Sequence, residues 1–221
     1  MTVQETYLRF LQLVNRNATN NNVNVDLYRF VKIFNDVQNR YVEWNLDKRN
    51  EDSIRNVQKL LVVEFPLLPT GSTASTSTFE LPPNFFDFAN ISAIASTDCC
   101  KKERVLVHEI KSEDAEEKVN DKYSEPSFDW RETFGYLANG SFVVFEKDFD
   151  TNELLLTYYR EPLQIDIEGY PRLDGTPSTN VDPEFDDVIV NRILLAAAKE
   201  FSAINANPEG YALDKDRLFN I

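Results

Sequence analysis

A group of carboxylates around residue 180 is the best candidate for chemistry in this chain. Its members are Asp174, Asp182, Glu184, Asp186 and Asp187. Carboxylate oxygens are ligands that divalent cations prefer, so the group could serve a metal-dependent hydrolase. The same acids suit the first turn of a helix, where a carboxylate caps free N–H groups and meets the positive end of the helix dipole. Helix capping accounts for Asp182 and its neighbours, so we expect no metal ion and no catalytic residue here.

Histidine, cysteine and glycine are too scarce for the other common kinds of site. The chain has 1 histidine, His108, and 2 cysteines, the adjacent Cys99 and Cys100. Neighbouring cysteines rarely bridge, because a disulfide needs Cα atoms farther apart than one peptide bond places them. We therefore expect neither a disulfide framework nor a cysteine-based zinc site. His108 is expected to be an ordinary strand residue, the 6 ungrouped glycines form no phosphate-binding loop, and no cofactor is predicted.

Two groups of aromatic residues could form a binding surface. Tyr158 and Tyr159 precede Arg160 in an apparent strand, and aromatic rings of this kind stack on bases and sugars. Successive strand residues face opposite ways, so we expect one tyrosine in the core and the other at an interface or in solvent. The phenylalanine-rich stretch 85–88 is expected to pack in the core or at a corner, or to contact a neighbouring subunit.

The composition is that of a globular protein with a strong acidic excess. Of the 221 residues, 42% are hydrophobic and 27% are charged, and the formal net charge is −14. That charge argues against a nucleic-acid binder, which needs a basic face, but it allows a surface past which DNA slides without sticking. The sequence has no apolar run of membrane-spanning length and no signal peptide, so we expect no membrane contact and an intracellular origin.

The strongest secondary-structure signal is a long helix over residues 182–205. Asp182 suits the N-cap, and Pro183 suits the first helical position. Apolar residues recur close to the helical period and are predicted to form a core or a contact between subunits. These residues are Phe185, Val188, Ile189, Ile193, Ala197 and Phe201. Further apolar residues widen the stripe, so the helix must be covered on most sides, by its own domain or by copies of the protein.

Three shorter helices are predicted in the N-terminal part of the chain. The first opens with capping-box spacing at Thr2 and Glu5. The second is capped by Asp26 and carries one apolar face. The third begins near residues 52–53 and ends before Pro66, because a residue before proline avoids the helical region.

Strand and turn signals alternate between residues 79 and 160, with an acidic surface helix at 112–119. The clearest turn is Asn139-Gly140, which suits the two positive-φ positions of a type I′ hairpin. The predicted fold class is therefore α+β. A helical bundle, formed by residues 1–68 and the long helix of segment 163–221, carries an inserted antiparallel β-domain at 69–162.

Four segments, in this order, resemble a known family. They are FELPPNF at 79–85, VHEI at 107–110 with its acidic helix, YLANGSFVVF at 136–145 leading to LLTYYREP at 155–162, and DPEF at 182–185. The pattern, which covers most of the chain, is similar to the head-to-tail adaptor (connector, or tubular protein A-like) family of tailed bacteriophages, particularly those with short tails. The acidic composition and the asparagine-rich loop also look like the ring proteins beneath the portal of crAss-like phages.

This resemblance implies a structural virion protein without catalysis. It implies a homo-oligomeric ring, dodecameric in the family, that lies below the portal protein, extends the DNA channel and docks the next neck or tail ring protein. Genomic DNA would pass through without sequence-specific binding, and the ring would assemble in the host bacterial cytoplasm. The C-terminal tail is shorter than in some related adaptors, which leaves open the surface that meets the portal.

Two other functions remain open on the residues alone. A carbohydrate- or protein-binding β-module on a helical stalk would use exposed aromatic residues of the strand block. A metal-dependent hydrolase would use the acidic group around residue 180. Glycan binding by a stable monomer distinguishes the first, and cation affinity that is lost when Asp182 and Asp186 become alanine distinguishes the second.

Overall fold

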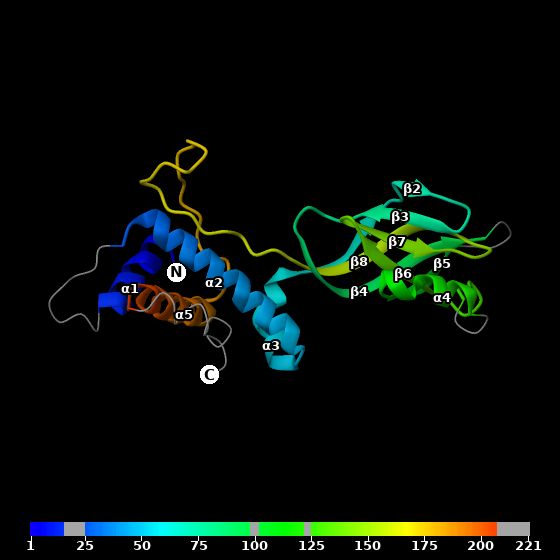
Figure 1. Ribbon diagram of the computed structural model, residues 1–221, viewed down its shortest axis with the longest axis horizontal. Coiled ribbons are helices and arrows are strands. Elements are labelled where there is room, and N and C mark those ends of the chain that lie inside the picture. The colour runs from blue at the N-terminus through cyan, green and yellow to red at the C-terminus, as the bar shows by residue number, and fades with distance from the viewer. Residues whose placement is uncertain (16–24, 98–101, 122–124, 207–221) are drawn as a thin grey trace. The chain divides into compact units, whose positions relative to one another are not determined.

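The chain folds into two compact units. The computed structural model describes residues 1–15, 25–97, 102–121 and 125–206. One unit joins residues 1–59 to residues 162–221, and the other spans residues 60–161. The first unit contains α1 (Val3–Asn15), α2 (Leu27–Lys48), α3 (Glu51–Val57) and α5 (Asp187–Ala206) (Figure 1). The strands lie in the second unit, so the predicted α+β class with an inserted strand unit is confirmed.

The N-termini of α1 and α2 are fixed by the local signals that the sequence predicts. The Thr2 amide donates to Glu5 Oε2 at 2.8 Å, and the Glu5 amide donates to Thr2 Oγ1 at 3.2 Å, which completes a capping box. Asp26 caps α2 by accepting from the Arg29 amide. The prediction for α3 is wrong in its cap, because Asn50 and Ser53 form the reciprocal box.

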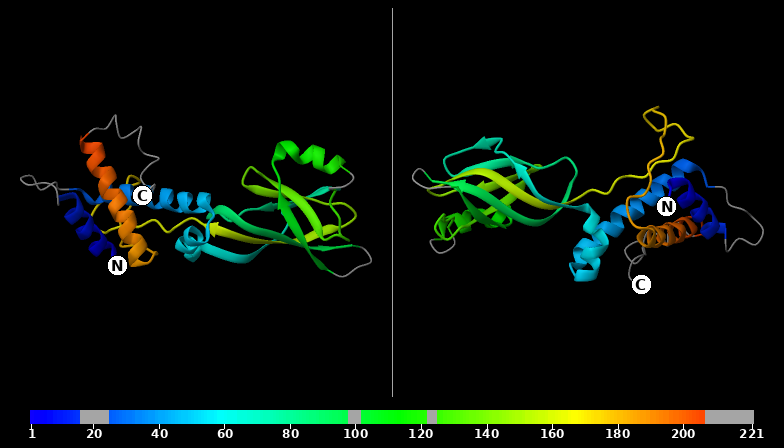
Figure 2. Two further views of the ribbon diagram at one scale, coloured as in Figure 1. Left: turned by 90° about the horizontal axis from the view of Figure 1, so that it is seen from below. Right: turned by 180° about the vertical axis from the view of Figure 1, so that it is seen from behind.

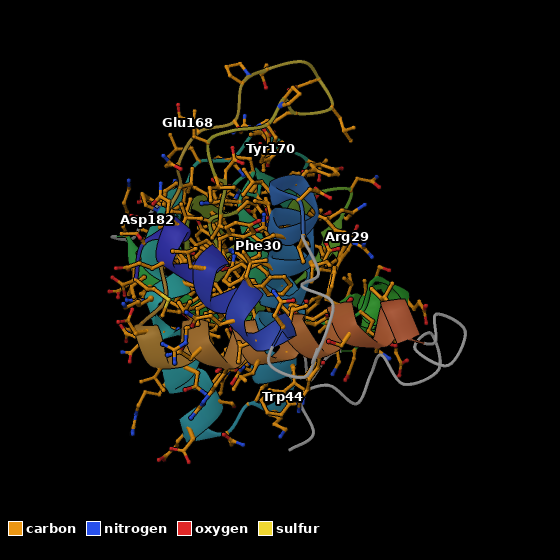
Figure 3. All side chains as sticks on the ribbon, turned by 90° about the vertical axis from the view of Figure 1, so that its left-hand side faces the viewer. Arg29, Phe30, Trp44, Glu168, Tyr170 and Asp182 are labelled. Atoms are coloured by element: carbon orange, nitrogen blue, oxygen red, sulfur yellow. The ribbon has the colours of Figure 1, made fainter. Side chains whose placement is uncertain are left out.

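Aromatic side chains fill the core of the helical unit, where α1 and α2 both pack against α5. The ring of Phe10 lies 5.2 Å from Phe30 and 5.8 Å from Phe201, measured between centroids. The Arg29 guanidinium covers the outer face of Phe201 at 4.7 Å. Figure 2 shows α5 crossing α2, and Figure 3 places Arg29 and Phe30 on α2. Burial of these large rings is the main stabilising contribution to this unit.

The strand unit is one curled eight-stranded sheet in the order β1-β8-β4-β5-β6-β7-β3-β2. Its strands are β1 (Leu61–Leu67), β2 (Gly71–Ser72), β3 (Thr76–Glu80), β4 (Phe85–Ser96), β5 (Glu103–Glu109), β6 (Glu132–Ala138), β7 (Ser141–Phe145) and β8 (Asp150–Arg160). The sheet is mixed, not wholly antiparallel as predicted, because β5 and β6 pair in parallel. Their connection contains η2 (Ser112–Asp114) and α4 (Ala115–Asn120), which matches the predicted acidic helix.

One face of the curled sheet encloses the main core of this unit. Side chains from six strands meet there, among them Phe79, Ile91, Phe142, Leu154 and Tyr158. The alternation of strand residues then places Leu106 and His108 of β5 on the opposite face, where both are exposed. The hairpin between β6 and β7 turns at Asn139 and Gly140, with φ of 49° and 76°, as predicted for a type I′ turn.

The start of the strand unit differs from the prediction. Residues 61–67 form β1, whereas the sequence predicts that the third helix continues to Pro66. Leu61 pairs with Tyr159, and Leu67 pairs with Leu154. The strand unit therefore begins at Leu60, not at residue 69, and the predicted connector 69–78 contributes β2 and the start of β3. Pro66 is tolerated because β1 is an edge strand.

Candidate functional site

The sequence predicts that Asp182 caps the long helix, but in the structure this residue lies against the start of α1. Its Oδ1 accepts from the Val3 amide at 2.7 Å. Helix α5 begins only at Asp187, after the Asp186 carbonyl accepts from the amides of Ile189 and Val190. The predicted N-cap is therefore wrong, because a free N–H group from the other end of the sequence competes for the same carboxylate.

The remaining acids of the group bind separate partners. Glu184 Oε1 accepts from the Leu163 amide at 2.7 Å, and Asp186 pairs with Lys59 Nζ at 2.5 Å. Asp174 accepts from its own turn, at the Thr176 amide, and Asp187 accepts from the Met1 amino group. Among the described residues there is no group of three or more metal-ligating side chains that could hold an ion. The acids hold segments together in this structure and do not converge on one point.

Because Asp182 binds the Val3 amide and does not cap α5, we expect Asp182→Ala to loosen α1 and to leave α5 intact. Losing one capping acceptor costs about 1 kcal/mol of stability. Hydrogen exchange should speed up at residues 3–6 and stay unchanged at residues 188–192. Faster exchange confined to the start of α5 would contradict the structure and restore the predicted cap.

The residues predicted to form a core or subunit contact on the long helix separate into two classes. Phe185, Ile189, Ile193, Ala197 and Phe201 are buried within the chain itself. Val188 is 65% exposed. Of the two predicted roles, core or subunit contact, the five buried residues therefore have the first, because α1 and α2 of the same unit pack against α5.

The part of α5 that remains uncovered combines apolar and basic side chains. It is the α5 outer stripe, formed by Val188, Arg192, Leu195 and Lys199, which recur at helical spacing and are all exposed. Leu195 is 49% exposed. In the described part of the chain, neither Arg192 nor Lys199 forms an ion pair. A basic stripe is unusual on a chain with a net charge of −14.

Helix α2 exposes the cations Arg29, Lys32 and Lys48 as well as a group of acids. Arg40, which lies among these acids, pairs with Glu200 of α5. Asp36, Glu43 and Asp47 are exposed and lie within one stripe, here called the α2 acidic stripe. Lys32 lies one turn before Asp36, so the acidic part begins at Asp36. The two stripes lie on different helices of one unit and have complementary charge.

The loop of residues 163–181, which lies between β8 and α5 in the chain, is hydrogen-bonded to α2. The Asn35 side chain donates to the Ile165 carbonyl at 3.0 Å and accepts from the Ile165 amide at 2.9 Å. Gln38 donates to the Leu163 carbonyl at 2.9 Å, and the rings of Tyr28 and Tyr170 meet edge to face. The sequence predicts only an irregular return segment here.

A buried carboxylate organises the base of this loop. Asp166 is 6% exposed, and its Oδ1 accepts from the Tyr170 hydroxyl at 2.6 Å and the Ile167 amide at 2.9 Å. Its Oδ2 accepts from the Thr179 amide at 3.0 Å and from two nitrogens of Arg172. Burial alone would raise the pKa of the Asp166 carboxyl, but these donors outweigh burial and hold it below its usual value.

The same contacts shift the partners of Asp166 in the opposite direction. Burial, followed by the hydrogen bond to Asp166, raises the pKa of Tyr170 to about 12. The hydrogen bond to Asp166 also raises the pKa of Arg172. At neutral pH the loop base is therefore a carboxylate held by a neutral phenol and a cation, an arrangement that stabilises and orders the loop.

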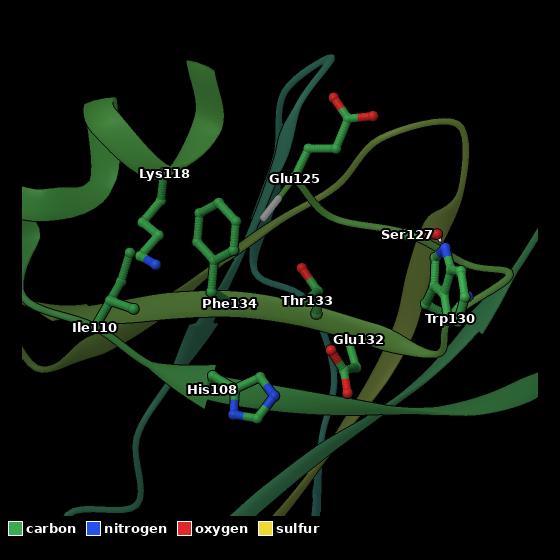
Figure 4. A pocket seen from close by; sticks show the side chains of 9 residues that line it. All are labelled: His108, Ile110, Lys118, Glu125, Ser127, Trp130, Glu132, Thr133 and Phe134. Atoms are coloured by element: carbon green, nitrogen blue, oxygen red, sulfur yellow. Dashed lines mark hydrogen bonds between the residues drawn. The ribbon is translucent and has the colours of Figure 1, made fainter. Parts of the chain in front are cut away.

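The strand unit has a depression of about 250 Å³ on the sheet face opposite its main core. Its lining includes His108 of β5, Glu132 of β6 and Lys118 of α4. Figure 4 shows Trp130 at one end, Lys118 at the other, and His108 and Glu132 between them. Trp130 is 82% exposed. The position of His108 in a strand is as predicted, but no pattern in the sequence predicts a binding role for Trp130.

The aromatic residues singled out in the sequence are mostly structural. Tyr158 and Tyr159 are both buried, so the expectation of one at an interface or in solvent is wrong. Tyr158 donates to Asn84 Oδ1 at 3.0 Å, and burial raises its pKa. Phe85 and Phe88 pack beside the core with ring centroids 4.5 Å apart, as predicted. Cys99 and Cys100 lie outside the described residues.

No described helix has the length and apolarity needed to cross a bilayer. No protein-family model matches this chain, and no curated protein matches it.

Proposed function

We propose that this protein is a structural component of a tailed-phage neck, where copies of it form a ring below the portal. The ring extends the DNA channel, and one of its rims docks the next neck or tail protein. The order of the four segments, from FELPPNF to DPEF, supports this family, and the α+β fold with an inserted strand unit agrees with what the family implies.

The main support for a ring is the difference in charge between the α5 outer stripe and the α2 acidic stripe. Closed rings use heterologous contacts, in which one face of a subunit meets a different face of its neighbour. The α5 outer stripe offers Leu195 between the cations Arg192 and Lys199, and the α2 acidic stripe offers three carboxylates. Such complementary faces attract each other between copies, while identical faces repel.

The acidic excess also suits a channel for DNA. Each copy contributes a formal charge of −14, and a ring multiplies that charge around its opening. Short-range repulsion from phosphates then lets DNA pass without binding, because attraction would need a basic lining. Catalysis, a metal ion and a cofactor have no part in this function.

Electron microscopy of the purified chain, alone and mixed with its portal protein, tests the proposal. We expect rings of one copy number, seated coaxially on the portal. A chain that stays monomeric and leaves the portal bare would overturn it.

Charge reversal tests which faces meet. Replacing Arg192 and Lys199 with glutamate should raise the concentration needed for half-assembly about tenfold or more, because like charges then face each other. Adding Asp36→Lys and Glu43→Lys to the same chain should restore assembly. Particle mass at a series of protein concentrations measures both effects, and raised salt should weaken wild-type assembly.

The matched control reverses two other exposed cations, Arg9 and Lys102, which changes the net charge equally. This control should assemble like the wild type. Rings that form equally well with glutamate at residues 192 and 199 would show that other faces are in contact.

A further inference from the structure

The turn that carries Trp130 is built to hold this side chain outward. The amide of Ser127 donates to the Glu132 carbonyl at 2.9 Å, and the Glu132 amide donates back to the Ser127 carbonyl at 3.1 Å. Inside the turn, the Arg131 amide donates to the Phe128 carbonyl at 3.1 Å, and the Trp130 amide donates to Ser127 Oγ at 3.3 Å. These bonds fix the backbone on both sides of Trp130.

Two anchors fasten the turn to the sheet. Phe128 packs against the small core cluster of Ala95, Val105 and Phe149. On the other side, the Arg131 carbonyl accepts from the Leu106 amide at 2.8 Å. Arg131 itself has a left-handed backbone with φ of 56°, a conformation that a bulky residue adopts only when its surroundings impose it. The fold therefore orders a turn in which Phe128 points inward and the large indole ring of Trp130 is left in solvent.

The depression beside Trp130 offers hydrogen-bonding groups of both kinds. Lys118 donates only, Glu132 accepts only, and His108 can do either. Glu125 is present as well, paired with Lys147 at 2.5 Å. A hydroxyl group both donates and accepts, so a ligand with several hydroxyls on one ring can use all of these groups at once. The volume of about 250 Å³ suits a ligand of one or two small rings.

The charges around the depression exclude other ligands for an exposed tryptophan. Nucleic acid stacks on aromatic residues within a basic groove, whereas the carboxylates of Glu125 and Glu132 balance the charges of Lys118 and Lys147 here. The core of a protein–protein interface is depleted in Lys and Glu, whereas Lys118, Glu125 and Glu132 line the depression itself. An uncharged, hydroxyl-rich ring with an apolar face is the chemistry that fits.

We propose that the depression formed by Trp130, His108, Lys118 and Glu132 binds a neutral hexose or N-acetylhexosamine unit of a glycan. The apolar face of the sugar lies on the indole ring, and its hydroxyls meet the polar side chains. The site shares no residue with the α5 outer stripe or the α2 acidic stripe, because every residue of the site belongs to the strand unit.

An array of neutral, sialylated and sulfated oligosaccharides, probed with the full chain, tests this directly. We expect binding to neutral members only. Trp130→Ala should weaken that binding about tenfold or more, and Trp130→Phe should weaken it less, because a smaller aromatic ring remains. Leu137→Ala is the matched control, since Leu137 is an exposed apolar residue that lies in β6 and outside the depression, and this variant should bind as the wild type does.

Fluorescence gives a second readout at the site itself. The chain has 2 tryptophans, so Trp44→Phe leaves Trp130 as the sole indole reporter. Titration with a neutral oligosaccharide identified on the array should shift its emission, with the same affinity as on the array. Absence of glycan binding, binding to anionic glycans only, or binding that persists in Trp130→Ala would each overturn the proposal. The proposal would also be overturned if the wild type binds no glycan and Trp130→Ala loses attachment of a neck protein.

Discussion

Replacing Ala197 with glutamate is expected to unfold the helical unit or to destabilise it by several kcal/mol. Ala197 is 0% exposed within the chain itself, where α1 and α2 pack against α5. A glutamate there places a carboxylate in an apolar setting without a partner, which is among the most costly single changes in a core. Thermal unfolding followed by circular dichroism should show a lower midpoint, and the soluble yield should fall.

Leu195→Glu, on the same helix, is the matched control. Leu195 belongs to the α5 outer stripe and is half exposed, so the new carboxylate stays in water and the fold should keep its stability within about 1 kcal/mol. Assembly should weaken, however, because a negative charge enters a stripe that we propose to meet the α2 acidic stripe of the neighbouring copy. Equal loss of stability in both variants would show that the buried and exposed faces of α5 are assigned wrongly.

Removing the carboxylate of Asp166 is expected to open the loop at residues 163–181. Asp166→Ala leaves Tyr170 and the amides of Ile167 and Thr179 without their acceptor, which costs roughly 2–4 kcal/mol of the free energy of opening. Hydrogen exchange at these two amides should become roughly 100-fold faster. Asp174→Ala removes a carboxylate from the exposed tip of the same loop and should leave their exchange nearly unchanged.

The same carboxylate makes the loop sensitive to acid. The pKa of Asp166 in the folded state lies below its ordinary value of 3.8, so the folded chain binds fewer protons than the unfolded chain in that range. The resulting stabilisation is complete above the ordinary value and is lost as pH falls through the lower, folded one. Exchange at Thr179 should therefore accelerate below about pH 4 in the wild type, and Asp166→Ala should lack this dependence. An acid response that survives in Asp166→Ala would assign it to another group.

Features fixed by neighbouring residues could be predicted from the sequence. The capping box at Thr2 and Glu5, the cap at Asp26 and the turn at Asn139-Gly140 each depend on residues within one turn of each other, and each is present. The stretch at β1 could not be assigned in this way, because a short apolar run suits a buried helix and a strand equally. This stretch forms a strand because it pairs with β8, which lies nearly one hundred residues later in the chain.

The candidate sites depend on contacts between distant residues, which no local pattern contains. Asp182 looks like the cap of the helix that follows it, yet its partner is Val3. The donors around Asp166 come from four positions of an irregular loop, and the sequence marks none of them. Trp130 had a detectable signal, since an apolar aromatic stands among Asp129, Arg131 and Glu132 in a turn, but its exposure becomes clear only when Phe128 is seen to take the inward position.

Native mass spectrometry of the full chain, alone and with its portal protein, shows whether copies of this chain form a closed ring. We expect one dominant assembly with a fixed copy number near twelve, as the family resemblance implies. Replacing Arg192 and Lys199 with glutamate should lower the assembled fraction and raise the monomer fraction at the same protein concentration. A monomer under all of these conditions, with or without the portal, would contradict the proposed ring.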